Sequence, residues 1–202
     1  MIIKNVVFDL GGVLIDWNPK YLYRKIFSSE QQVDWFLDNV CTGEWNSKQD
    51  EGRTMAEATK SLVDRYPEYT MEITSYYQRW TEMLNGQIEG TVRILETLRS
   101  NSDHRLLALT NWSGESFPTA LKMFDFLNWF EGIVVSGDEK LIKPDHRIYQ
   151  VLFERYRINP ENSVFIDDSE KNVEASRELG MTGIHFVNPE SLKLQLTEVG
   201  VI

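Results

Sequence analysis

Short apolar runs alternate with longer helical segments through the second half of the chain, and this alternation limits the fold more than any other feature. The runs are rich in β-branched residues, whereas the longer segments carry apolar residues at helical spacing. Strands that alternate with helices are joined by right-handed crossovers and form a parallel sheet. We therefore predict an α/β fold with a doubly wound parallel sheet. Its predicted elements are the helices Thr91–Ser100, Phe117–Phe126, Pro144–Tyr156 and Ser169–Leu179 and the strands Arg105–Leu109, Gly132–Ser136, Ser163–Ile166 and Gly183–Val187.

The N-terminal segment predicts one more strand of this sheet, followed by an inserted helical region. Ile3–Leu10 is apolar and ends at Gly11-Gly12, as a buried strand does when it enters a tight turn. In the residues that follow, apolar side chains recur at helical spacing between Ser, Asp, Pro and Gly residues. We therefore predict a core domain of residues 1–15 and 88–202, with a helical-bundle cap domain of residues 16–87 inserted above the sheet.

The net charge of the chain limits the kinds of molecule that it is expected to bind. The formal net charge is -10, and no stretch concentrates Lys or Arg, so the chain repels nucleic-acid phosphates and anionic membrane surfaces. No apolar run reaches the length of a membrane span, and the single Cys41 cannot form an intramolecular disulfide, which favours a packed thiol. We expect a cytoplasmic protein, a monomer or weak homodimer, that binds a small molecule and neither nucleic acid nor membrane.

Polar residues follow the predicted strands at one edge of the sheet, where the ligand site of a doubly wound fold lies. Three carboxylates, a hydroxyl, an amide and a lysine at one edge suit phosphoryl transfer, which needs charge neutralisation and positioning. Carboxylate oxygens are also ligands that Mg²⁺ prefers, and an aspartate can attack phosphorus to form an aspartyl-phosphate. The residues at this edge are Asp9, Thr110, Asn111, Lys143, Asp167 and Asp168.

Four segments carry a resemblance to a known family. They are Phe8–Leu14, Leu109–Asn111, Lys143–Asp145 and Phe165–Asp168, and they resemble the four ordered motifs of the haloacid-dehalogenase-like (HAD) hydrolases. The resemblance spans the whole predicted core. It implies a Rossmann-like HAD sheet, and it accounts for the helical insertion, because subfamilies of these hydrolases carry a helical cap between the first and second motifs.

The same resemblance implies a role for each motif residue. Asp9 would be the catalytic nucleophile, and Lys143 would be a catalytic residue that steadies negative charge. Thr110 and Asn111 would bind the phosphoryl group of a small phosphorylated metabolite. The metal would be Mg²⁺, and its implied ligands are Asp9, Gly11, Asp167 and Asp168.

Gly11 departs from the pattern of most phosphatases in this superfamily, which carry a second aspartate there as general acid and base. The Gly11 carbonyl can still bind metal, but general acid catalysis, which contributes about 10²–10⁴-fold in rate, lacks its usual donor. The pattern Asp-Leu-Gly-Gly-Val-Leu resembles bacterial sugar-phosphate phosphatases related to the N-terminal domain of soluble epoxide hydrolase. A sugar-1-phosphate would tolerate the missing acid, because its anomeric oxygen leaves readily. We therefore predict a sugar-phosphate substrate such as a hexose-1-phosphate.

The segment Gly43–Arg53 combines aromatic, polar and cationic residues within the predicted cap. In capped members of the superfamily, a cap loop faces the active site and sets the choice of substrate. We therefore predict that this segment is such a loop, with Trp45 and Arg53 as substrate-binding residues.

Other interpretations remain open. A haloacid dehalogenase would also use an aspartate nucleophile without a metal, but crowded carboxylates such as Asp167 and Asp168 resist joint ionisation unless a cation is present. A non-catalytic binding module would keep the fold and the Mg²⁺ site without turnover. In a structural interpretation, this acidic pair would favour the N-terminus of the next helix beside a capping Ser169, and Lys143 would be a solvated surface residue.

Overall fold

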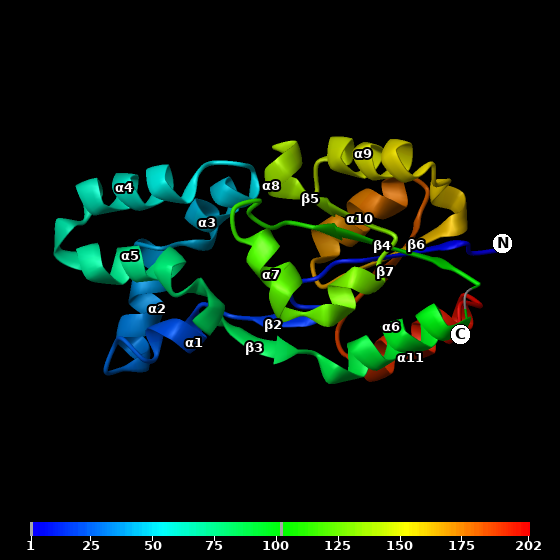
Figure 1. Cartoon of the computed structure of the whole chain (residues 1–202), viewed down its shortest axis with the longest axis horizontal. Helices are drawn as coiled ribbons and strands as arrows, with labels where there is room; N and C mark the ends of the chain where they lie inside the picture. The colour runs from blue at the N-terminus through cyan, green and yellow to red at the C-terminus, as the bar shows by residue number, and fades with distance from the viewer. Residues whose placement is uncertain (1, 102) are drawn as a thin grey trace.

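A five-stranded parallel sheet forms the centre of the core domain in the computed structural model, which describes residues 2–101 and 103–202 (Figure 1). The central strand β1 pairs in parallel with β4 on one side and β6 on the other, and the strand order is β5-β4-β1-β6-β7. This order confirms the predicted doubly wound sheet. The strands are β1 (Asn5–Phe8), β4 (Arg105–Thr110), β5 (Gly132–Val135), β6 (Ser163–Asp167) and β7 (Thr182–His185).

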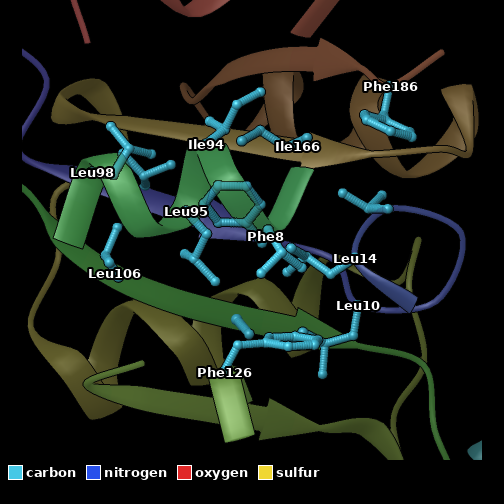
Figure 2. Close-up of a cluster of buried hydrophobic side chains, with 14 of the residues drawn as sticks. Phe8, Leu10, Leu14, Ile94, Leu95, Leu98, Leu106, Phe126, Ile166 and Phe186 are labelled. Carbon is cyan, nitrogen blue, oxygen red and sulfur yellow. The ribbon is translucent and has the colours of Figure 1, made fainter. Parts of the chain in front are cut away.

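Helices cover both faces of this sheet. Alternate residues of a strand point to opposite faces, so Val6 and Phe8 join one apolar cluster while Val7 joins another. Figure 2 shows Phe8 of β1 with Leu95 and Ile166 in the first cluster. Helices α6 (Glu89–Asn101), α7 (Phe117–Met123) and α11 (Pro189–Glu198) contribute to the first cluster, and α9 (His146–Tyr156) and α10 (Glu170–Glu178) to the second.

The predicted and observed elements differ at several places. The helix predicted from Pro144 begins at His146, because the Asp145 side chain accepts a hydrogen bond from the Arg147 N–H and caps the helix. The strand predicted through Ser136 ends one residue earlier, where the short helix α8 (Ser136–Glu139) starts. The C-terminal helix α11 was not predicted, and it follows the capping residue Asn188.

The inserted region is helical, with an apolar cluster of its own. Its members include Tyr23, Phe36 and Tyr76, and the predicted packed thiol Cys41 is buried among them. Figure 1 shows this region at one end of the long axis and the sheet at the other. The helices are α1 (Lys20–Tyr23), α2 (Glu30–Asn39), α3 (Gly43–Asp50), α4 (Met55–Arg65) and α5 (Thr70–Gln78), with 3₁₀ turns at Pro67–Tyr69 and Trp80–Met83.

Two short strands that were not predicted join this region to the core. β2 (Ile15–Trp17) and β3 (Leu84–Gln87) pair antiparallel, and they bring the two ends of the inserted region side by side. The predicted boundaries at residues 15/16 and 87/88 fall at these strands, and they stay predictions. Further 3₁₀ turns in the core lie at Asp125–Trp129 and Pro160–Asn162.

Candidate active site

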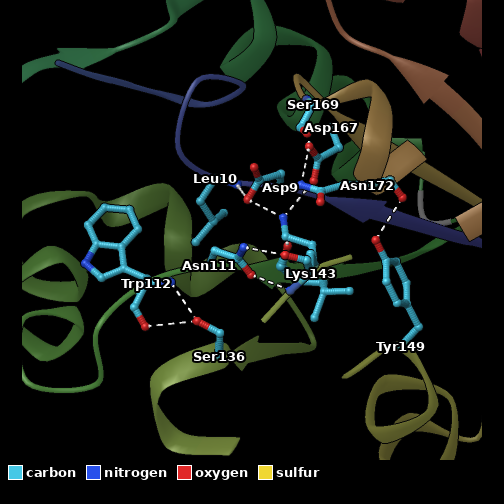
Figure 3. Close-up of polar contacts among 11 residues, drawn as sticks. Asp9, Leu10, Asn111, Trp112, Ser136, Lys143, Tyr149, Asp167, Ser169 and Asn172 are labelled. Atoms are coloured by element: carbon cyan, nitrogen blue, oxygen red, sulfur yellow. Dashed lines mark hydrogen bonds and ion pairs between the residues drawn. The ribbon is translucent and has the colours of Figure 1, made fainter. Parts of the chain in front are cut away.

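Asp9 directly follows the central strand and is buried at the carboxyl edge of the sheet, with 8% of its surface exposed. Its Oδ1 accepts a hydrogen bond from the Leu10 N–H at 2.7 Å and lies 2.9 Å from the Lys143 ammonium (Figure 3). Burial raises the pKa of Asp9 to about 7, and the positive charge of Lys143 opposes this rise more than any other neighbour. Asp9 therefore sits where a cation would favour its charged form.

Lys143 is the buried cation of the site. Its Nζ lies 2.7 Å from Asp167 Oδ2 and donates to the Leu109 carbonyl oxygen at 2.9 Å, in addition to its contact with Asp9. Burial acts to lower the pKa of Lys143, but the charges of Asp9 and Asp167 outweigh it and raise the pKa above its ordinary value. The interpretation of Lys143 as a solvated surface residue is therefore wrong.

The adjacent carboxylates Asp167 and Asp168 have different surroundings. Asp167 is fully buried, and besides Lys143 it accepts hydrogen bonds at Oδ1 from the Ser169 N–H at 2.8 Å and from Asn172 Nδ2 at 3.0 Å. Asp168 is exposed at the same edge. Ser169 occupies the capping position of α10 but makes no capping hydrogen bond with its side chain. Asp167 is thus held in place from two sides, whereas the exposed Asp168 carboxylate lies against Gly12.

The acidic residues at this edge can hold a metal ion. Asp9, Asp167 and Asp168 each offer a carboxylate oxygen, and these oxygens lie within 4.8 Å of one another. Hard divalent cations such as Mg²⁺ bind oxygen ligands of this kind, usually together with phosphate oxygens and water. A divalent cation would also offset the mutual repulsion of the carboxylates, so the donor set fits Mg²⁺.

Thr110 is the last residue of β4 and Asn111 follows it, so both lie at the carboxyl end of this strand. Asn111 Oδ1 accepts a hydrogen bond from the Lys143 N–H at 2.8 Å, and its Nδ2 donates to the Lys143 carbonyl at 3.1 Å. Asn111 therefore fixes the backbone that carries the buried lysine. The Thr110 hydroxyl is buried and has no hydrogen-bond partner among the residues that the structure describes. Leaving such a group unpaired is unfavourable, although Thr110 itself is not among the residues that line the cavity described below.

A cavity of about 360 Å³ lies between this edge and the inserted helices. The core contributes Asp9 and Asp168, so the cavity opens directly onto the acidic cluster. Aromatic rings form much of the wall, and Trp80 meets Trp112 edge to face at 6.3 Å between centroids. The other lining residues are Gly11, Gly12, Trp17, Asn46, Asp50, Met55, Tyr76, Tyr77, Asn111, Ser113 and Ser116.

A comparison with known protein families identifies the family to which the chain belongs. The family model described as haloacid dehalogenase-like hydrolase matches residues 6–186, which include all four motif segments. The chain belongs to this family. The predicted family is thereby confirmed, and the HAD hydrolase fold accounts for the position of the motifs at the carboxyl edge of the sheet.

Several named proteins are similar in sequence to this HAD hydrolase. It is 26% identical to a phosphorylated carbohydrates phosphatase of Thermotoga maritima, over 90% of this chain and 84% of that one. It is also 26% identical to a D-ribitol-5-phosphate phosphatase of Bacteroides thetaiotaomicron, over 98% of both chains. A longer relative, drimenol cyclase drtB of Aspergillus calidoustus, is 25% identical, and the chain spans 36% of its length.

Solved structures of the same family share the fold. A wild-type HAD family enzyme of Bacteroides thetaiotaomicron, in complex with magnesium and inorganic phosphate, superposes with a TM-score of 0.67. The two chains are 23% identical, and the match covers 92% of this chain and 95% of the other. Among the residues that our structure describes, no helix is long and apolar enough to cross a membrane.

The structure places Trp45 and Arg53 away from the cavity of the HAD hydrolase. Trp45 is 8% exposed in the apolar cluster of the inserted helices, where its Nε1 donates to the Ala58 carbonyl. Arg53 donates from Nε to Gln49 Oε1 at 2.7 Å and from Nη2 to the Trp45 carbonyl at 2.8 Å. Neither residue lines the cavity; Trp45 connects α3 to α4, and Arg53 holds the residues of α3 that precede it. The structure therefore differs from the predicted cap loop that carries Trp45 and Arg53 into the cavity.

The reason is that Gly43–Asp50 forms a helix rather than the predicted loop. Thr42 caps this helix, because its side chain accepts a hydrogen bond from the Trp45 N–H. Residues four apart share one face of a helix, so the face with Trp45 packs inside the cap while Asn46 and Asp50 line the cavity. The spacing of these two residues is the sequence signal that could have identified them.

Proposed function

We propose that this HAD hydrolase is a Mg²⁺-dependent phosphohydrolase that acts on a small phosphate monoester through an aspartyl-phosphate on Asp9. One observation carries the proposal: the Asp9 carboxylate lies at the floor of a metabolite-sized cavity, beside a buried lysine and two further carboxylates. This is the combination of nucleophile, fixed positive charge and metal ligands that phosphoryl transfer requires. The phosphatase names of two relatives with high coverage support it.

The residues of the chain would act in a defined order. Asp9 would attack phosphorus, and the Thr110 hydroxyl would donate to a phosphoryl oxygen. Lys143 keeps its positive charge beside the nucleophile, because Asp167 holds its ammonium group. When bound, Mg²⁺ would neutralise charge on the phosphoryl oxygens. Water would then hydrolyse the aspartyl-phosphate and release inorganic phosphate.

We assign Mg²⁺ to the Asp9 and Asp168 carboxylates and the Gly11 carbonyl. Gly11 lines the cavity beside Asp9, and its carbonyl needs no side chain to act as a ligand. Both carboxylate oxygens of Asp167 already have protein partners, so its main role would be to position Lys143. This assignment gives the cation two carboxylates and leaves room for phosphate oxygens and water.

The finer proposal concerns the substrate, which would be a sugar phosphate such as a hexose-1-phosphate. Aromatic side chains such as Trp17, Trp80 and Trp112 offer flat surfaces for the apolar face of a sugar ring. Asn46 and Ser113 offer hydrogen-bonding groups to its hydroxyls. A cavity of about 360 Å³ suits a molecule of this size.

The proposed function is tested by phosphate release from glucose-1-phosphate, glucose-6-phosphate and p-nitrophenyl phosphate, each with Mg²⁺ or EDTA. We expect metal-dependent release, and faster release from the 1-phosphate than from the 6-phosphate, because its anomeric oxygen leaves more readily. Halide release from a 2-haloacid in EDTA would instead favour the dehalogenase. Mg²⁺ binding without release from any ester would favour the binding module. Cytoplasmic location and a monomeric or weakly dimeric state stay predictions.

Stabilisation by Mg²⁺ should grow with pH. The pKa of Asp9 is raised by burial to about 7, so without a metal the folded protein retains a proton that the unfolded chain releases above its ordinary pKa of 3.8. The free energy of unfolding therefore falls as pH rises toward 7. Mg²⁺ replaces the proton, so the gain in Tm should increase from about pH 5 to about pH 8. Thermal unfolding with Mg²⁺ or EDTA measures it, and a gain that is constant across this range would contradict the assignment.

Gly12→Ala should weaken Mg²⁺ binding by about 10–100-fold, as changes beside metal ligands commonly do. Gly12 has φ +75°, and a Cβ there would overlap the Asp168 carboxylate. Gly200→Ala is the matched control, because Gly200 has φ +73° and no atom within 4 Å of the added Cβ. Both variants carry a similar backbone strain, but only Gly12→Ala should change the Mg²⁺ affinity in a calorimetric titration. Equal Mg²⁺ affinities in the two variants would show that Asp168 is not a ligand of the metal.

A further inference from the structure

The cavity contains one carboxyl group that the proposed mechanism does not use. Asp50 stands at the C-terminal end of α3 in the inserted region, yet it lines the same cavity as Asp9 and Asp168. Those two belong to the acidic cluster that fits a metal ion, whereas Asp50 is not among its members. Asp50 is therefore a carboxyl group that faces the substrate space from the cap.

The end of α3 is fixed to the core, so this position is structurally defined. The Ser136 hydroxyl donates to the Asp50 carbonyl oxygen at 2.5 Å, and its oxygen accepts from the Trp112 N–H at 2.9 Å. Figure 3 shows Asn111 between this Ser136–Trp112 contact and the Asp9 and Lys143 pair. Just beyond the helix, a Cβ on Gly52 would lie 3.1 Å from the Gly137 carbonyl oxygen, so the two backbones approach closely.

The surroundings of the Asp50 carboxyl suit a group that gives and takes a proton. Burial raises its pKa to about 7, while the Ser113 backbone N–H and the positive charge of Lys143 oppose the rise. The phenol groups of Tyr76 and Tyr77 on α5 are the other titratable groups near it. Efficient general acids have pKa values close to the working pH.

In-line attack would direct the leaving group into the cavity. The attacking and leaving oxygens lie roughly in line through phosphorus. Asp9 would attack from the edge of the sheet, so the leaving oxygen would point away from the sheet and into the cavity, whose wall includes Asp50 from the inserted helix α3. At Gly11, the usual position of the acid, there is no side chain at all.

We propose that Asp50, supplied by the cap, is the general acid and base that Gly11 cannot provide. This inference rests on the proposed phosphohydrolase function.

Each step of this mechanism balances. As an Asp9 oxygen bonds to phosphorus, the ester P–O bond breaks, and its electron pair takes the proton of the Asp50 carboxyl, so the alcohol leaves neutral. The Asp50 carboxylate then accepts a proton from water. The water oxygen bonds to phosphorus, the P–O bond to Asp9 breaks, and Asp9 is regenerated as a carboxylate. Inorganic phosphate leaves, and Asp50 is protonated again.

The test compares leaving groups in Asp50→Asn, which keeps the shape of the side chain but cannot donate a carboxylic proton. Glucose-6-phosphate releases a poor alkoxide leaving group, so its kcat/KM should fall by about 10²–10⁴-fold. p-Nitrophenyl phosphate releases a stable phenolate, so its formation of the aspartyl-phosphate should fall by less than about tenfold, as measured by the burst of p-nitrophenol. Glu51→Gln is the matched control, because it removes the next carboxyl along the chain, which does not line the cavity.

The outcomes separate this inference from the function on which it rests. The role of Asp50 would be supported by two results together. The wild type hydrolyses p-nitrophenyl phosphate, and Asp50→Asn loses activity only toward glucose-6-phosphate, which has the poor leaving group. A loss of the same size in kcat/KM for glucose-6-phosphate and in the burst rate for p-nitrophenyl phosphate, or no loss in either, would overturn it while leaving the phosphohydrolase intact. A wild type that hydrolyses neither ester would overturn both. If Asp50→Asn does not fold, the same two leaving groups are compared in Asp50→Ser.

Discussion

Asp9→Asn is expected to lower kcat/KM for p-nitrophenyl phosphate by about 10⁴-fold or more, the range seen when a catalytic nucleophile is removed. An amide is a poor nucleophile toward phosphorus, and the change also removes a carboxylate from the acidic cluster. The fold should persist, because Asn keeps the size of the side chain and can still accept from the Leu10 N–H. Phosphate release and thermal unfolding, measured on the same preparation, separate the two effects.

The matched control for this variant is Asp16→Asn. Asp16 lies on β2, accepts a hydrogen bond from the Tyr21 hydroxyl and does not line the cavity, so its change should leave turnover within about twofold. Rapid acid quenching should trap a covalent phosphate on the wild type and on Asp16→Asn but not on Asp9→Asn. A phosphorylated Asp9→Asn protein would place the nucleophile elsewhere and contradict the proposed mechanism.

Lys143→Met should have the second largest effect, and it should act on both stability and turnover. The change leaves Asp9 and Asp167 buried without their cation, and breaking a buried pair in this way costs about 3–5 kcal/mol. Without Lys143 the pKa of Asp9 in the folded state rises further, because the positive charge that opposes its rise is gone. A raised pKa in the folded state stabilises at low pH and loses that contribution as pH rises, so the deficit should shrink from about pH 8 to about pH 5.

Denaturant unfolding across this pH range measures the deficit. Lys171→Met is the control, because Lys171 is exposed on α10, and its change should alter the free energy of unfolding by less than about 0.5 kcal/mol. At pH values where Lys143→Met is folded, its hydrolysis of p-nitrophenyl phosphate should be at least about 10²-fold slower, because no fixed positive charge stands beside the nucleophile. A stability deficit that does not vary with pH would show that the buried carboxylates do not depend on Lys143.

Local sequence patterns predicted much of the fold. The β-branched run before Asp9 and the run before Asp167 predicted two strands of a parallel sheet, and the structure pairs these two strands in parallel. The weaker elements were missed for a physical reason. β2 and β3 are short, and the residues that pair, such as Ile15 and Gln87, lie at opposite ends of the inserted region, so no local pattern signals their contact.

The candidate site likewise depends partly on local sequence patterns and partly on contacts between distant segments. The carboxyl ends of parallel strands meet at one edge, so the sequence order of the motifs was sufficient to predict that Asp9, Lys143 and Asp168 would lie close together. Their proposed roles depend on further properties. The burial that raises the pKa of Asp9, and the contacts by which Asn111 holds the Lys143 backbone, arise from packing between segments far apart in the sequence.

The sequence by itself therefore determined the family, the parallel sheet and the edge at which the polar residues gather, because each depends on short-range patterns repeated along the chain. Only the tertiary structure decided which face of α3 meets the cavity, and so that Asp50, not Trp45 or Arg53, lines the cavity together with Asp9. The reason is that the orientation of a helix is set by the apolar surface it buries, and the α3 surface that carries Trp45 packs against α4 and α5.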